Sequence, residues 1–204
     1  TIPRGYSASF SPESDFIAFK IKQPFDSIRN AKIKKIEKDK MPIDSLGIYI
    51  FKSKKLIKFP KLKSYSIPEE NAEWIAFLTE PEKKQNNDST KNANSDDPKK
   101  EKSDDKKDKD RLILYHVKTG DTIQYLNVKE FFYSKKGASI AIIQEPLDST
   151  KSSQVSLFRT TTREINSIFK KEGFSKKITT DEAGEQFAFL FSKDTIDEKK
   201  YSLY

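Results

Sequence analysis

Histidine is the first side chain to consider for acid–base chemistry, and this sequence of 204 residues contains one, His116. It lies in the apolar stretch Leu112-Ile113-Leu114-Tyr115-His116-Val117, which is typical of a strand. A lone histidine in a strand is more often structural than catalytic, and it excludes every metal site built on two histidines. The chain has no cysteine, which excludes disulfides and thiolate metal sites.

Carboxylates occur in pairs at Asp96-Asp97 and Asp104-Asp105, and paired carboxylates bind cations or act as acid and base. Lysines flank both pairs and neutralise them, and a loop of this composition does not hold side chains in a fixed geometry. The sequence has no Gly-x-Ser-x-Gly, and none of its six glycines lies in a phosphate-binding pattern. We therefore predict that the chain contains no catalytic, cofactor-binding or metal-binding residue.

The net charge of +8 raises the possibility of a nucleic-acid-binding protein. Residues 82–110 hold nine lysines and nine acids, so the excess falls in Lys20–Lys40 and Lys52–Lys63. Binding of single-stranded nucleic acid needs basic residues interleaved with exposed aromatic residues. The aromatic residues here fall in apolar strands instead, so we predict no nucleic-acid partner.

A short motif of an apolar residue, an alanine and a second apolar residue organises the sequence. It occurs four times, at Ile17-Ala18-Phe19, Ile75-Ala76-Phe77, Ile140-Ala141-Ile142 and Phe187-Ala188-Phe189. Each copy reads as a strand buried on both faces, because it is a short apolar run bounded by polar turn residues. The preceding turns are Ser11–Ser14, Pro68–Asn71, Ser134–Gly137 and Asp181–Gly184.

Further strands follow each motif. The second strands are Gly47–Phe51, Leu112–Tyr115, Val155–Phe158 and Tyr201–Tyr204, and in three copies a third strand begins near Ile57, Ile123 and Ile165. A short extended piece then ends the repeat at Tyr65, Phe131 and Phe174. This order resembles the four-stranded antiparallel meander of a propeller blade. The prediction is an all-β fold, a partial β-propeller of three to four blades over residues 1–204.

Two insertions explain why the spacing between motifs exceeds that of an ordinary blade. Both fall between the motif strand and the strand after it: residues 22–45 in the first blade and residues 80–110 in the second. We expect a short amphipathic turn of helix within residues 26–40. Residues 82–110 contain one apolar side chain, Ala93, so we predict a disordered charged loop that proteases cut first.

Two stretches resemble the prolyl oligopeptidase family of serine peptidases, including its dipeptidyl-peptidase and acylaminoacyl-peptidase branches. Residues 6–19 are similar to the family's blade opening, aromatic-Ser-Pro-Asp-Gly-aromatic-apolar-Ala-aromatic, although Glu13-Ser14-Asp15 stands where Asp-Gly is usual. Residues 39–48 look like the first-blade loop of large exported peptidases from Bacteroidetes. The resemblance covers most of the chain except residues 82–110.

The resemblance implies a parent serine peptidase with an N-terminal propeller and a C-terminal α/β-hydrolase domain that carries the triad. The implied role of this segment is to gate access of peptide substrates to that domain, in a periplasmic or otherwise exported protein. No motif in the sequence assigns a substrate-binding role of the family to Arg4 or Arg29. The alternative is a stand-alone propeller that binds proteins or glycans and has no enzymatic activity.

The chain opens with Thr1-Ile2-Pro3 and its one methionine, Met41, is internal, so we expect it to start within a longer protein. No run of 18 apolar residues is present, so we predict no membrane span. Propellers close with about four to eight blades. An incomplete ring leaves exposed sheet edges, so we expect the isolated chain to be poorly soluble or oligomeric.

Overall fold

The computed structural model describes residues 1–37, 40–81, 110–145, 152–194 and 198–204. Their strands form four antiparallel sheets, each built from strands that follow one another in the chain. Sheet 1 comprises β1 (Gly5–Phe10), β2 (Phe16–Ile21), β3 (Ser45–Ile50) and β4 (Lys55–Phe59). Sheet 2 comprises β5 (Leu62–Ser66), β6 (Trp74–Thr79), β7 (Arg111–His116) and β8 (Thr122–Tyr125). Sheet 3 comprises β9 (Val128–Tyr133), β10 (Ser139–Gln144), β11 (Ser152–Arg159) and β12 (Glu164–Glu172). Sheet 4 comprises β13 (Phe174–Thr180), β14 (Phe187–Ser192) and β15 (Ser202–Leu203).

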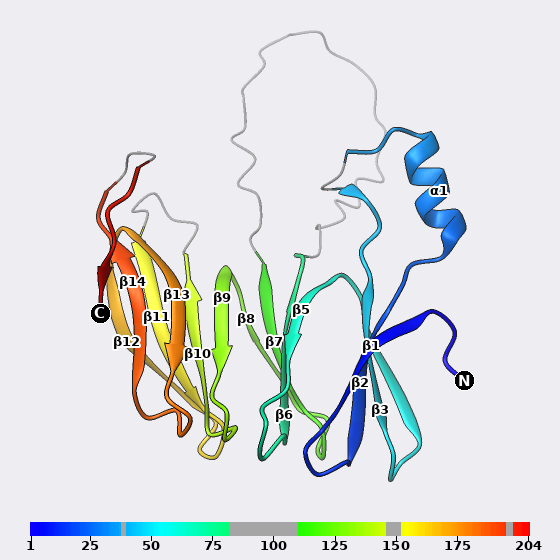
Figure 1. Cartoon of the computed structure of the whole chain (residues 1–204), viewed down its shortest axis with the longest axis horizontal. Helices are drawn as coiled ribbons and strands as arrows, with labels where there is room; N and C mark the ends of the chain where they lie inside the picture. Colours follow the sequence, from blue (N-terminus) through cyan, green and yellow to red (C-terminus); the bar gives the residue numbers. More distant parts are fainter. Residues whose placement is uncertain (38–39, 82–109, 146–151, 195–197) are drawn as a thin grey trace, which may run out of the picture.

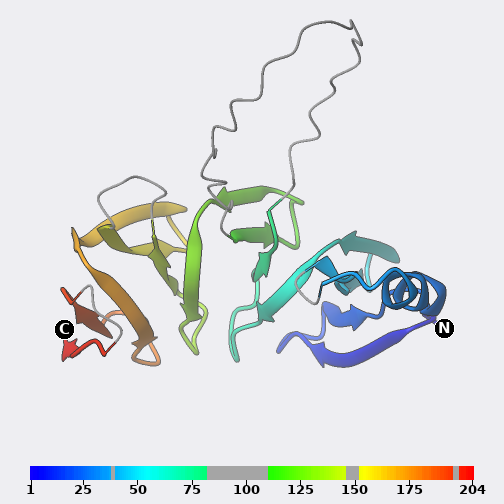
Figure 2. The same cartoon turned by 90° about the horizontal axis from the view of Figure 1, so that it is seen from above.

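The sheets stand side by side in a row that follows the order of the sequence (Figure 1). In sheets 1 to 3 the first strand lies toward one side of the row and the last strand toward the other (Figure 2). Sheets 1 and 4 occupy opposite ends, so the ring is open. Antiparallel meanders packed face to face are the blades of a propeller. The predicted fold class, an all-β partial propeller of three to four blades, is confirmed.

The alanine motifs occupy equivalent places in successive sheets. Ala18, Ala76 and Ala141 are fully buried on the second strand and lie opposite Ile48, Leu114 and Leu157 of the third strand. Strand β6 shows why both faces are apolar. Its Ile75 and Phe77 pack in the core between sheets 1 and 2, whereas Trp74 packs in the core between sheets 2 and 3.

The predicted division of the chain into blades was wrong by one strand. Tyr65, Phe131 and Phe174, expected to end a blade, lie on β5, β9 and β13, which begin the next sheet. The steps between sheets are as short as hairpin turns, and each contains a left-handed residue: Lys61 (φ 57°), Asn127 (φ 60°) and Gly173 (φ 136°). Spacing therefore does not distinguish a hairpin within a sheet from a step to the next one.

The connection from β2 to β3 contains the helix α1 (Phe25–Ile33). Asp26 lies in its first turn and Lys32 in its last, which suits the helix dipole, and Ala31 is its buried residue. Neither this helix nor any other within the described ranges is long and apolar enough to cross a membrane. Of the predicted disordered loop, residues 82–110 in the connection from β6 to β7, residues 82–109 lie outside the described residues.

Candidate functional site

Four equivalent turns, each joining the first strand of a sheet to its second, build one end of the molecule. Their fourth residues all adopt a left-handed backbone: Ser14 (φ 56°), Asn71 (φ 50°), Gly137 (φ 74°) and Gly184 (φ 75°). In three of the turns the first side chain accepts a hydrogen bond from a backbone N–H four or five residues later. These bonds are Asp15 to Ser11 (2.9 Å), Ser139 to Ser134 (3.0 Å) and Glu185 to Asp181 (2.7 Å). Short polar side chains favour such turns because they replace a missing backbone partner.

Hydrogen bonds also join each turn to the next. The Ala72 amide donates to the Glu13 carboxylate (3.3 Å), and the Glu69 amide donates to the Lys135 carbonyl (3.0 Å). The Lys136 amide donates to the Glu182 carbonyl (3.0 Å). Neighbouring sheets are therefore held in fixed positions at this end, which sets the shape of the clefts between them.

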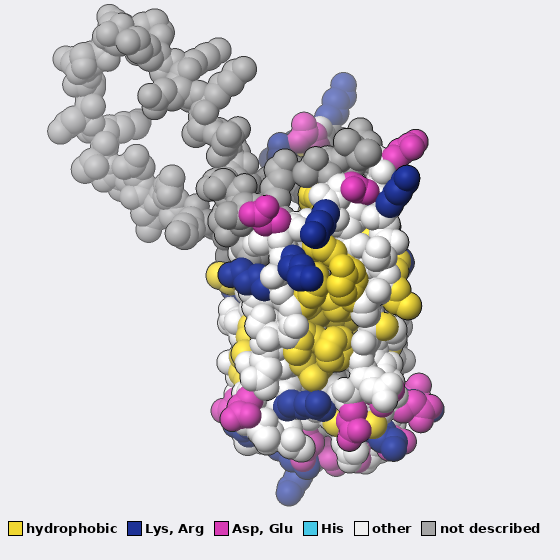
Figure 3. All heavy atoms as spheres, turned by 90° about the vertical axis from the view of Figure 1, so that its left-hand side faces the viewer, with side chains coloured by type: hydrophobic (Ala, Val, Ile, Leu, Met, Phe, Trp, Pro, Cys, Tyr) yellow, Lys and Arg dark blue, Asp and Glu magenta, His cyan; other side chains and the backbone are white. Residues whose placement is uncertain are grey.

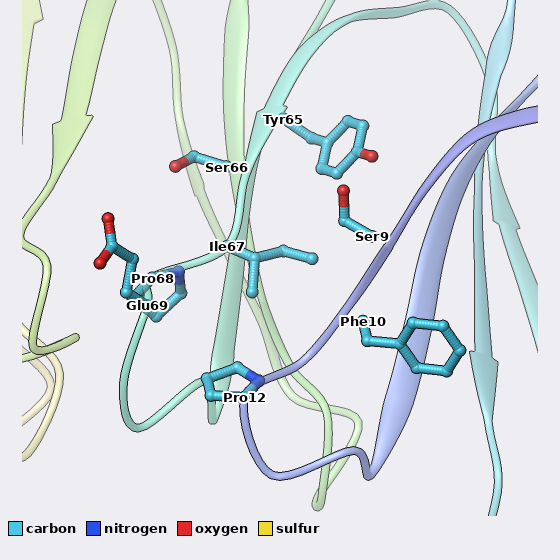
Figure 4. A pocket seen from close by; sticks show the side chains of 8 residues that line it. All are labelled: Ser9, Phe10, Pro12, Tyr65, Ser66, Ile67, Pro68 and Glu69. Carbon is cyan, nitrogen blue, oxygen red and sulfur yellow. The ribbon is translucent and has the colours of Figure 1, made fainter.

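A cleft of about 570 Å³ opens between β1 of sheet 1 and β5 of sheet 2 (Figure 4). It is lined by Ser9, Phe10, Pro12, Tyr65, Ser66, Ile67, Pro68 and Glu69. Ile67 points toward β1, whereas the Phe10 ring turns away from the cleft (Figure 4). Phe10 instead stacks on Phe51 at a centroid distance of 6.0 Å. The lining combines apolar side chains with three hydroxyl groups, those of Ser9, Tyr65 and Ser66, and with the Glu69 carboxylate.

Two polar groups of this cleft, those of Tyr65 and Glu69, are engaged in structural contacts. The Tyr65 hydroxyl donates to the Ser7 carbonyl across the two sheets (2.9 Å). Glu69 pairs with Lys135 of the neighbouring turn (3.5 Å). No histidine lines the cleft, so Ser9 and Ser66 have no imidazole base beside them. The arrangement supports binding of an extended segment rather than a reaction.

The histidine lies outside this cleft. His116 is 6% exposed, its ring packs edge-on against Trp74 (centroid distance 4.8 Å), and its Nδ1 accepts from the Thr119 amide (3.1 Å). Its Nε2 lies 3.9 Å from Glu73. Burial lowers the pKa of His116, and the positive charge of Arg163 lowers it further. His116 therefore occupies a structural position between sheets 2 and 3.

The remaining chemical candidates do not assemble into a site. Both aspartate pairs, Asp96-Asp97 and Asp104-Asp105, lie outside the described residues. Arg29 is exposed on α1, and Arg4 is exposed just before β1. In the described ranges, no group of three or more potential ligands could hold a metal ion.

The two stretches with family resemblance meet in the structure. Tyr6 of the first stretch donates its hydroxyl proton to Asp44 of the second (2.6 Å). The Gln23 amide donates to the other oxygen of the same carboxylate (3.1 Å). The hydrogen bond to Asp44 raises the pKa of Tyr6 to about 12. One carboxylate thus ties the opening of β1 to both ends of the β2–β3 connection.

Sequence reasoning did not identify the cleft between β1 and β5. Its walls are contributed by segments more than 50 residues apart, and its residue types are ordinary for turns and strands. The available signal was a pair of prolines, Pro12 and Pro68, at equivalent turns. Proline stiffens the backbone on both sides of the opening.

The comparisons with known proteins come from structure alone. No family model matches the sequence, and no curated protein matches it either. The β-propeller domain of the trilobed protease from Pyrococcus furiosus is similar with a TM-score of 0.54 and 12% identity. That match covers 98% of this chain and 53% of that chain, so this chain spans about half the length of its neighbour.

Two further solved structures illustrate the range of similar proteins. An acylaminoacyl peptidase in complex with Z-Gly-Gly-Phe-chloromethyl ketone matches at a TM-score of 0.50 and 12% identity, covering all of this chain and 31% of that one. An oligogalacturonate lyase in complex with manganese matches at 0.56 and 10% identity, covering 96% of this chain and 48% of that one. At these identities the similarity establishes a propeller fold and leaves activity open.

Proposed function

We propose that this chain is the non-catalytic propeller portion of a prolyl-oligopeptidase-like serine peptidase of the Bacteroidetes type, with the catalytic α/β-hydrolase domain outside these residues. One observation carries the proposal. The family-like opening at residues 6–19 forms β1, its turn and β2, so it begins a blade of a fold similar to the trilobed protease propeller. A family-like motif that also begins a blade in the structure favours an architecture shared with the family over a chance similarity.

In this proposal the chain gates access of peptides to the hydrolase domain. The first strands lie toward one side of the row, and the cleft between β1 and β5 opens there. In a closed ring these strands would face the central channel. A peptide in extended conformation would contact Ile67 and Tyr65 while passing, and the serine hydroxyls would bond its backbone.

The free outer faces of the end sheets support a ring with further blades. In sheet 1 a cross-strand row of Phe10, Ile17, Tyr49 and Leu56 points away from sheet 2. In sheet 4 the side chains of Leu190 and Leu203 point away from sheet 3, and a hydrophobic band is visible on this face (Figure 3). Exposed apolar patches of this kind mark an interaction surface. The neighbour domain of about twice this length supports additional sheets as the covering elements.

The proposal is tested on the full-length parent protein with Ser9→Trp, which fills the cleft from β1. We expect kcat/KM for a decapeptide to fall about tenfold and that for a tripeptide substrate to change less than about twofold. Ser167→Trp, at an exposed position on β12, is the control. Absence of labelling of the parent by a fluorophosphonate would refute the peptidase assignment, and equal effects on both substrates would refute gating.

A second function is supported by the similarity to the oligogalacturonate lyase, because the same propeller fold is not restricted to peptidases. The alternative is a stand-alone propeller that binds proteins or glycans. The open reading frame that encodes this segment distinguishes the two. A Gly-x-Ser-x-Gly followed by aspartate and histidine downstream supports the peptidase, and a stop codon soon after one ring of blades supports the binding module.

The proposed location, periplasmic or otherwise exported, rests on the family resemblance alone. Fractionation of the source cells with an antibody against this chain tests it. Recovery with the cytoplasmic fraction would contradict this part of the proposal and leave the peptidase assignment intact.

A further inference from the structure

A second cleft, of about 740 Å³, lies between sheets 1 and 2 at the end where the four turns meet. Four segments enclose it: the turn from β3 to β4, the turn from β7 to β8, the turn leading into β2 and the turn leading into β6. The lining residues are Asp15, Phe16, Ile50, Lys52, Ser53, Lys55, Ala72, Glu73, Tyr115, Val117, Lys118, Thr119 and Gly120. Its size falls in the range of small-molecule binding sites, about 300–1,000 Å³.

The bottom of this cleft is apolar. Phe16 is 1% exposed, Ala72 is 5% exposed, and Val117 and Tyr115 are each 6% exposed. All four belong to the hydrophobic core between sheets 1 and 2. The cleft therefore reaches down to rigid core side chains that are already positioned by packing, which lowers the entropic cost of binding an apolar group.

Lysines stand at the mouth of the cleft. Lys52 lies in the turn from β3 to β4 and Lys55 is the first residue of β4. No ion pair joins either lysine to a carboxylate among the residues that the structure describes. Lys118, on the opposite wall, is already paired with Glu73 (2.7 Å). Asp15 is the remaining acid of the lining. Three lysines against two carboxylates give the lining a net charge of +1.

We infer that this cleft binds a monocarboxylate with an apolar body, such as the C-terminal residue of a peptide. The apolar body lies against the part-exposed Ile50 and the accessible edges of Tyr115 and Val117, above the buried Phe16 and Ala72, and the carboxylate accepts hydrogen bonds from Lys52 and Lys55. Charge-assisted hydrogen bonds of this type are among the strongest polar contacts in proteins. The inference does not depend on the peptidase assignment, because it rests on the lining of this cleft alone.

The charge balance selects a monocarboxylate over other anions. A phosphate monoester carries about two negative charges at neutral pH. It would exceed the single net positive charge of the lining and face the Asp15 and Glu73 carboxylates. A nucleic acid would need a longer cationic surface than two adjacent lysines.

The test is a titration of the isotope-labelled chain with N-acetyl-L-phenylalanine, followed by amide chemical shifts. We expect shifts confined to the lining, including Ala72, Val117 and Gly120. N-acetyl-L-phenylalanine amide keeps the apolar body and removes the charge, and we expect it to bind about tenfold more weakly, since a hydrogen-bonded ion pair is lost. Inorganic phosphate should produce no shifts in the lining at the same concentration.

Matched variants test the two lysines. Lys52→Gln/Lys55→Gln is expected to weaken binding of the carboxylate about tenfold and to leave binding of the amide unchanged. Lys54→Gln is the control, because Lys54 belongs to the same turn but does not line the cleft. Equal binding of carboxylate and amide, an equal effect of the control variant, or no shifts at millimolar concentration would each overturn the inference.

Discussion

The interface between sheets 2 and 3 and the outer face of sheet 4 carry the same kinds of side chain in different surroundings. In the interface, Trp74 is 1% exposed and packs edge-on against Phe158 at a centroid distance of 5.6 Å. Arg163 from the β11–β12 turn lies over the Trp74 ring at 5.5 Å. On sheet 4, Leu203 is 73% exposed and lies opposite Leu190. Blade faces are apolar in both places, and the presence of a neighbouring sheet decides whether that surface stabilises the fold.

Lysines cover part of the apolar surface of sheet 4. The ammonium group of Lys176 lies 3.6 Å from the ring centroid of Tyr201, and that of Lys199 lies 4.6 Å from Phe174. Such contacts shield aromatic surface while the charge remains in water. They leave Leu203 exposed, so the hydrophobic band of Figure 3 is only partly covered.

The largest expected effect on stability comes from removing the Trp74 side chain from the interface between sheets 2 and 3. Trp74→Ala is expected to lower the free energy of unfolding by about 3–5 kcal/mol, because a fully buried aromatic side chain leaves a cavity that cannot collapse. Denaturant unfolding followed by circular dichroism measures this loss. A loss below about 1 kcal/mol would mean that the interface between sheets 2 and 3 contributes little.

Gly137 joins the same two sheets, and its replacement should have the next largest effect. A Cβ atom there would meet the carbonyl oxygens of Glu70 at 2.5 Å and Asn71 at 2.7 Å, and its φ is +74°. We expect Gly137→Ala to cost about 2 kcal/mol or more, since the left-handed backbone costs about 1–2 kcal/mol before any clash. Gly120→Ala is the control: φ is +82° but the nearest atom, the Tyr115 hydroxyl oxygen, lies at 3.8 Å. Equal losses from both substitutions would contradict the close approach of the turns.

His116 should make the stability of the interface between sheets 2 and 3 depend on pH. Because burial lowers its pKa in the folded protein, the unfolded chain binds a proton near pH 6.5 that the folded chain does not. Stability should therefore fall as the pH drops below about 6.5, toward the lowered pKa of the folded state. Melting temperatures of the wild type and of His116→Gln between pH 7.5 and 5.5 test this, since the chain has no other histidine. The same pH dependence in both proteins would rule out His116 as its source.

The smallest effect on stability is expected at the outer face of sheet 4. Leu190→Ser/Leu203→Ser should change the free energy of unfolding by about 1 kcal/mol or less, because no packed neighbour is lost. It should shift the isolated chain from oligomer to monomer in sedimentation velocity, since this face is available for association. Phe25→Ser, at an exposed position of α1, is the control. A wild-type chain that is already a monomer would contradict the prediction of self-association.

The alanine motif allowed the repeat and the class of fold to be predicted from sequence. Ala18, Ala76 and Ala141 fall at one register position, opposite the third strand of sheets 1, 2 and 3, and all three are fully buried. The boundary between blades was not predictable. Lys61 and Asn127 are left-handed residues in short connections, and such residues occur in hairpins and in steps between sheets alike.

The two clefts were beyond sequence reasoning for a related reason. Each is lined by segments from two different sheets, and its lining side chains, such as Lys52 and Lys118, are ordinary surface residues in the sequence. Their proximity depends on the angle between neighbouring blades. That angle is set by the hydrogen bonds from one turn to the next and by side chains such as Trp74, none of which has a local sequence signal.

The amino-acid sequence by itself determined the strands, their turns and the apolar character of both faces, because these follow from local periodicity and backbone preference. The tertiary structure decided which strand begins a sheet, which apolar faces are buried and which side chains share a cleft. These properties depend on contacts between residues more than 50 positions apart, such as the hydrogen bond from the Tyr65 hydroxyl to the Ser7 carbonyl, and on packing, which local patterns do not encode.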